Sequence, residues 1–97
     1  MSGAEVIETA RRVAERVAAL PDVVELSAGP YGTIATLGAG VRVKGVAVRD
    51  SGIEIGVVVR YGRPLPDIAE EVRGAAAAEA GPGDVHVSVE DVVAGAV

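Results

Sequence analysis

The segment from Ile53 to Asp91 constrains the fold more than any other part of the chain. Residues 53–61 and 84–90 alternate in side-chain polarity, as half-buried strands do. Between them, Pro64-Leu65-Pro66 opens a helical pattern that stops at Gly81 and Pro82. A strand, a crossover helix and a strand in one sheet normally form a right-handed parallel unit, so the rest of the chain must pack on it. The side chains expected to point into the core are Ile53, Ile55, Val57, Val59 and Tyr61 in the first strand, and Val85, Val87 and Val89 in the second.

A first helix is predicted upstream of Pro21. Ser2 and Glu5 have the spacing of a capping box, in which each side chain accepts a hydrogen bond from a backbone N–H at the helix start. Apolar side chains then recur at the three- and four-residue spacing of a half-buried helix. They are Val6, Ala10, Val13, Ala14 and Val17.

Short strands are predicted between the helices, at residues 22–28, 33–37 and from Val41 onward. The alternation of apolar and polar side chains shifts by one residue at Gly45. A glycine at such a shift indicates a β-bulge. The order α-β-β(-β)-α-β predicts an α+β two-layer sandwich with a mostly antiparallel sheet of about three to four strands and two helices on one face. We expect one domain over residues 1–97, ending in an apolar tail from Asp91.

Composition narrows the classes of function. The chain has no cysteine and one histidine, which argues against disulfides, thiol catalysis and a multi-histidine metal site. No apolar run approaches the roughly 18 residues that span a bilayer, and the start lacks the features of a signal peptide. We therefore expect a cytoplasmic protein that does not insert into membranes, with no metal, no cofactor and no catalytic residue.

The charged residues suggest one candidate binding surface. The net charge of −5 makes nucleic acid an unfavourable partner, yet residues 29–64 carry five basic and two acidic side chains. His86, between two inward valines, is expected to point outward with the basic residues of the sheet. This candidate partner-binding sheet face comprises Arg42, Lys44, Arg49, Arg60 and His86.

Other motifs do not indicate a reaction site. Gly38-x-Gly40 precedes a strand rather than a helix, so it is no dinucleotide loop. The serines lie outside any nucleophile-elbow pattern. A double-stranded-RNA-binding domain has a similar element order, but it needs basic residues at the start of its last helix, where this chain has Asp67, Glu70 and Glu71. We expect a protein that is not an enzyme.

Residues 45–93 resemble the alkaline-shock protein family, also called the Gls-type general stress proteins. The resemblance lies in GVAVR (45–49), GIEIGVVVRYG (52–62), LPDIAEEVR (65–73) and VHVSVEDV (85–92). It implies a bacterial cytoplasmic protein of cell-envelope homeostasis and alkaline or general stress, which self-associates and reaches the membrane through a small membrane-anchored partner. The segment Tyr31–Lys44 departs from the family pattern and is expected to be an irregular insert.

Two functions therefore stand as hypotheses. The first is a non-enzymatic assembly or adaptor module of the envelope-stress type. The second is a small regulatory or nucleic-acid-contacting domain that uses the basic sheet face. Assembly that tolerates salt favours the first, whereas a salt-sensitive complex with RNA or an acidic ligand favours the second.

Overall fold

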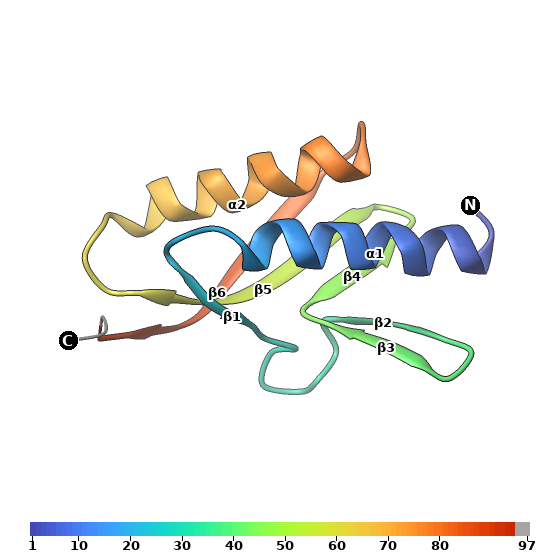
Figure 1. Cartoon of the computed structure of the whole chain (residues 1–97), viewed down its shortest axis with the longest axis horizontal. Helices are drawn as coiled ribbons and strands as arrows, with labels where there is room; N and C mark the ends of the chain where they lie inside the picture. Colours follow the sequence, from blue (N-terminus) through green and yellow to red (C-terminus); the bar gives the residue numbers. More distant parts are fainter. Residues whose placement is uncertain (95–97) are drawn as a thin grey trace.

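The computed structural model describes residues 1–94, in which two helices lie side by side on one face of a β-sheet (Figure 1). This is the predicted α+β two-layer architecture. A second, two-stranded sheet stands beside the main one. The elements are α1 (Gly3–Ala18), β1 (Val23–Leu26), β2 (Ala35–Gly38), β3 (Val41–Lys44), β4 (Val46–Arg49), β5 (Gly52–Arg60), α2 (Leu65–Ala80) and β6 (Val85–Val93).

Strand β5 is the centre of the main sheet. One of its edges pairs with β6 in parallel over its length, which confirms the predicted strand–helix–strand unit. The other edge is shared by two antiparallel strands. β4 pairs with the first half of β5, with Val46 opposite Ile55, and β1 pairs with the second half, with Leu26 opposite Val57. Gly56 lies where the two partners meet.

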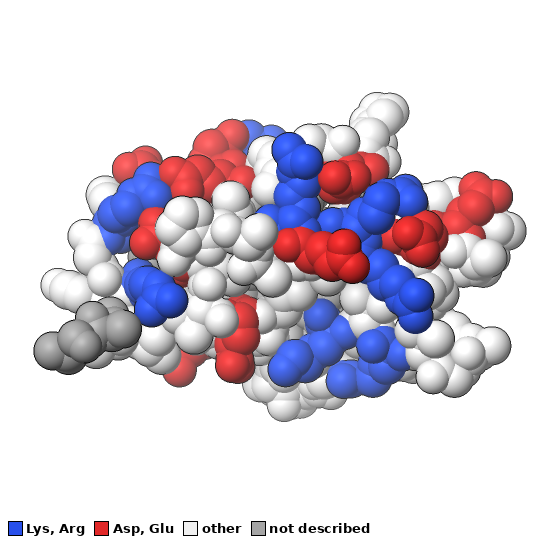
Figure 2. All heavy atoms as spheres, viewed as in Figure 1, with Lys and Arg blue, Asp and Glu red and all other residues white. Residues whose placement is uncertain are grey.

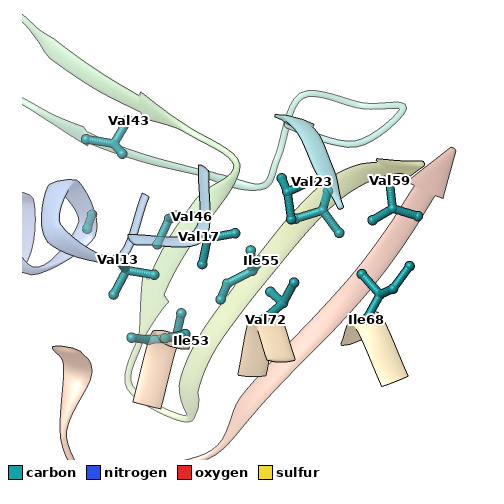
Figure 3. Packing of buried hydrophobic residues seen from close by; sticks show 13 residues of the cluster. Val13, Val17, Val23, Val43, Val46, Ile53, Ile55, Val59, Ile68 and Val72 are labelled. Carbon is teal, nitrogen blue, oxygen red and sulfur yellow. The ribbon is translucent and has the colours of Figure 1, made fainter. Parts of the chain in front are cut away.

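The core lies between the helices and the sheet, and aliphatic side chains fill it (Figure 3). The predicted inward phase of β5 is confirmed from Ile53 to Val59, but Tyr61 is an exception. β5 ends at Arg60 and the chain turns away at Gly62, so the Tyr61 ring is 80% exposed. The helices contribute Ala10, Val13, Val17, Ile68, Val72 and Ala76.

The phase change at Gly45 separates two strands instead of forming the predicted bulge. β3 before it pairs with β2, whereas β4 after it pairs with β5 without a register shift. Gly45 has a φ of +87°, and a Cβ there would lie 2.5 Å from Leu26 Cβ. A residue with a side chain would therefore be strained and would clash with β1.

The segment Tyr31–Lys44, expected to be irregular, contains the β2–β3 hairpin with a turn at Ala39 and Gly40. Thr36 fastens this hairpin to the main sheet. Its buried hydroxyl donates a hydrogen bond to the Val46 carbonyl at 2.8 Å and accepts one from the Val48 N–H at 3.1 Å. One side chain thus takes the place of backbone pairing along the outer edge of β4.

Strand β6 continues beyond its predicted end at Glu90. The register moves from Val89 opposite Val57 to Asp91 opposite Val58, so Glu90 is an extra residue in a β-bulge. The bulge keeps Val92 opposite Val59, on the helix-facing phase. Asp91, Val92 and Val93 therefore belong to the strand rather than to a tail, and the last three residues of the expected tail, 95–97, lie outside the described residues.

Candidate functional site

The sheet face that points away from the helices, called the outer face here, is covered in its middle by residues 27–34. Ser27 N–H donates to the Gly56 carbonyl at 2.8 Å. A Cβ on Gly56 would lie 2.1 Å from the Ser27 carbonyl oxygen and 3.1 Å from Ile34 Cδ1. Ile34 is only 5% exposed, and Ala47 on the same face is 1% exposed. The predicted basic face is therefore interrupted by the segment 27–34, whose Ile34 side chain lies against Gly56.

Two of the five predicted site residues, Arg49 and His86, lie together near the start of β5, on one side of the segment 27–34. Arg49 pairs with Glu54 at 2.9 Å and donates to the Thr33 carbonyl at 3.4 Å. His86 is the register partner of Glu54 on β6, and both line a shallow hollow with Arg49 and Asp84. Two carboxylates accompany the two basic groups, so this end of the face is mixed in charge.

Of the other three predicted residues, Arg60 is separate from this group, whereas Arg42 binds the carbonyl next to the one that Arg49 binds. Arg60, at the far end of β5, donates from Nε to the Pro21 carbonyl at 3.1 Å. Arg42 and Lys44 are on β3 in the hairpin sheet, where Arg42 donates to the Gly32 carbonyl at 3.3 Å. Figure 2 shows acidic and basic side chains interspersed over the helices, with a small basic group below α1 where the hairpin lies. The structure thus places His86 and Arg42 near Arg49, keeps Lys44 on β3 with Arg42, and separates Arg60 from the other four.

Arg63, outside the predicted site, forms ion pairs with two carboxylates. Its guanidinium contacts Asp22 at 2.6 Å and Glu71 at 2.5 Å, which ties the start of β1 to α2. The hydrogen bond and the positive charge of Arg63 lower the pKa of Glu71, and the two carboxylates raise the pKa of Arg63. The sequence gives no local signal for the contact with Asp22, because 41 residues separate the partners.

The Arg63–Glu71 pair predicts how stability responds to acid. A carboxylate whose pKa is lower in the folded state contributes stability above its unfolded pKa, and loses that contribution as the pH falls through the folded pKa. We expect Arg63→Gln to be less stable than the wild type at pH 7, and the difference to shrink as the pH falls below the ordinary glutamate value of 4.5. Urea denaturation between pH 7 and pH 2 measures both free energies of unfolding.

Arg11→Gln is the matched control, because Arg11 is exposed on α1 and contacts no carboxylate within 4 Å in the part of the chain that the structure describes. Its stability should follow the wild type at every pH. A gap between Arg63→Gln and the wild type that stays constant into acid would show that the guanidinium acts by packing rather than through Glu71.

A groove runs between the two helices. Small residues, including Ala19, Gly74 and Ala75, form part of its lining. On its rim, Glu79 pairs with Arg16 at 3.4 Å and with Arg12 at 3.8 Å. These pairs cross from α2 to α1 and hold the helices together, so the rim charges have a structural explanation.

Over residues 1–94, no group of three or more His, Asp or Glu side chains is arranged to hold a metal ion. None of the helices in that range is both long and apolar enough to cross a membrane. Comparison of the chain with protein-family models, with curated proteins and with solved structures finds no match in any of the three, so the resemblance to alkaline-shock proteins stays a prediction.

Proposed function

We propose that this protein is a non-enzymatic assembly or adaptor module of the envelope-stress type. The observation that carries the proposal is the free edge of β6. This strand is nine residues long and pairs only with β5 among the described elements. Such an edge presents a row of unpaired backbone N–H and C=O groups, which is a template for another strand.

The distribution of ionisable groups supports the same function. The arginine–carboxylate pairs lie at the surface, where Arg63, Arg49 and Glu79 link separate elements. Pairs of this kind fix the relative positions of helices and strands, and they leave each carboxylate beside a permanent positive charge. The surface is thus suited to docking rather than to proton transfer.

The resemblance of residues 45–93 to alkaline-shock proteins supports the cellular context of the proposal. In this context the protein acts in the bacterial cytoplasm and a small membrane-anchored protein recruits it to the envelope. The apolar group of Tyr61, Leu65 and Val92, which is 80%, 39% and 37% exposed, offers a second contact area at the end of the sheet.

Size-exclusion chromatography with light scattering tests the proposal. We expect the measured mass to rise with protein concentration and to remain high in about 1 M salt, because backbone hydrogen bonds and apolar contacts are weakly screened. The double variant Arg42→Glu/Arg60→Glu is the control, and its assembly should equal that of the wild type. A protein that stays monomeric at every concentration, and binds RNA in a salt-sensitive way that this variant weakens, would overturn the proposal in favour of the basic-face alternative.

A further inference from the structure

We propose that the occupant of the β6 edge is β6 of a second copy of this chain, paired antiparallel about a two-fold axis at Ser88. In this arrangement His86 of each copy lies opposite Asp91 of the other. The inference rests on the proposed assembly function, and it names the partner and the surface.

The hydrogen bonds to β5 show which backbone groups of β6 are free. The Asp84 carbonyl accepts from Ile53 N–H at 2.9 Å, and the Val93 carbonyl accepts from Tyr61 N–H at 2.7 Å. Backbone groups alternate in direction along a strand, and the bulge at Glu90 shifts that alternation by one residue. The residues that direct both N–H and C=O away from β5 are therefore Val85, Val87, Val89 and Val92. Among them, the Val92 N–H donates to the carboxylate of its neighbour Asp91 at 2.8 Å.

The same four valines lie on the helix-facing side of β6 and are incompletely covered. Val85, Val87 and Val89 are opposite buried residues of β5 but are only half-buried, and Val92 is 37% exposed. A second β6 strand would place valines beside valines and extend the apolar layer past the present edge. Burial of this remaining apolar surface favours association.

The polar side chains of β6 favour one register of the β6–β6 pair over its neighbours. Self-pairing centred on Ser88, with Glu90 still the bulged residue, sets Val85 opposite Val92 and Val87 opposite Val89. The Val87–Val89 pairs exchange two hydrogen bonds each, and the Val85–Val92 pairs do so when the Asp91 carboxylate turns from the Val92 N–H to His86 of the other copy. His86 and Asp91, both exposed on the outer face, then face each other twice. An imidazole N–H can donate to a carboxylate in either protonation state.

The neighbouring registers are less favourable. Centring on Val87 sets Asp84 opposite Asp91, and like charges directly opposite destabilise a pair of strands. Centring on Val89 sets His86 opposite Val93 and leaves Asp91 facing Ser88. Of the three registers, the Ser88-centred one alone places His86 opposite Asp91 on the outer face and valine opposite valine on the helix face.

The other edges of the main sheet offer less. β1 and β4 have four residues each, whereas β6 has nine. The outer edge of β4 is already engaged by the Thr36 hydroxyl. A long strand with one free side is therefore found at β6 within residues 1–94.

Ser88→Cys tests the register directly, because the chain has no other cysteine. Residues facing each other in a non-hydrogen-bonded antiparallel pair have Cα atoms about 4.5 Å apart, which lies within the roughly 4.4–6.8 Å range of disulfides. We expect a disulfide-linked dimer after mild oxidation, seen on a non-reducing gel. Ser51→Cys, in the exposed β4–β5 turn, is the control and should remain monomeric. Both alternative registers move the two Ser88 side chains apart.

A charge exchange provides the second measurement. His86→Asp places a carboxylate opposite Asp91 at both equivalent positions of the dimer. This repulsion should raise the dissociation constant of the dimer about tenfold. Adding Asp91→Lys to that variant restores opposite charges and should return the constant toward the wild-type value. Both positions are exposed, so circular dichroism should show an unchanged fold.

The outcomes separate the two proposals. Concentration-dependent assembly without cross-linking at Ser88→Cys, and without a response to His86→Asp, overturns the β6 pairing but leaves the assembly function standing. A wild-type protein that is monomeric at every concentration, together with cysteine variants neither of which cross-links, overturns both proposals. If the edge receives a strand from a different protein, Ser88→Cys alone stays monomeric and the self-pairing is wrong.

Discussion

Gly56→Ala will lower the free energy of unfolding by about 3 kcal/mol. The added Cβ would lie 2.1 Å from the Ser27 carbonyl oxygen, and that oxygen belongs to backbone held by β1. No side-chain rotation can relieve the overlap, so the segment 27–34 must move off the outer face. Its departure would expose Ile34 and Ala47 and break the bond from Ser27 N–H to the Gly56 carbonyl.

Gly74→Ala is the matched control, because it adds the same methyl group where nothing lies within 4 Å. Gly74 is inside α2, where alanine is favoured over glycine by about 0.5–1 kcal/mol. We expect this variant to be more stable than the wild type. Urea denaturation of both proteins gives the comparison, and equal small effects at the two positions would contradict the close approach at Gly56.

The sequence predicts the strand–helix–strand unit well because its signals are local. Ile53 to Val59 alternate over a full strand, and Pro66 and Gly81 mark the two ends of α2. Ser2 caps α1 as its spacing with Glu5 indicates, accepting a hydrogen bond from Glu5 N–H at 3.2 Å. In each case neighbouring residues determine the conformation.

The arrangement of the candidate site depends on contacts between distant segments, which no local pattern encodes. Residues 27–34 read as a turn and a short strand, yet they cross β5 at Gly56 and divide the basic face. Gly56 itself occupies an ordinary place in the alternation of β5. The missing side chain in a central strand is the signal that could have been used, since glycine there often marks the close approach of another backbone.

The bulge at Glu90 is hidden for a similar reason. Val85, Val87 and Val89 alternate regularly, and the sequence Glu90-Asp91 reads as the polar end of the strand. Only pairing with β5 shows that Val92 returns to the inward phase opposite Val59. The length of the free edge, on which the proposed assembly depends, therefore becomes visible in the structure alone.

Ile55→Ala should cost about 4 kcal/mol, in the upper part of the range for removing a large aliphatic side chain from a core. Ile55 is fully buried on the central strand, and it is among the largest fully buried side chains of the described residues. The surrounding core consists mainly of valine and alanine, with no phenylalanine or tryptophan in the chain. Short, stiff side chains cannot rotate into the cavity, so little of the lost contact is recovered.

Thermal denaturation measures this effect as a fall in Tm of roughly 15–30 °C, since each kcal/mol shifts Tm by about 4–8 °C in a domain of this size. Leu37→Ala is the control, because it also truncates a large aliphatic side chain, but at a position that is 72% exposed on β2. It should change stability by about 0.5 kcal/mol or less. If Ile55→Ala were as mild as Leu37→Ala, the core would be able to repack around a cavity. The apolar faces of β5 and the helices would then not be the rigid layer that supports a free β6 edge.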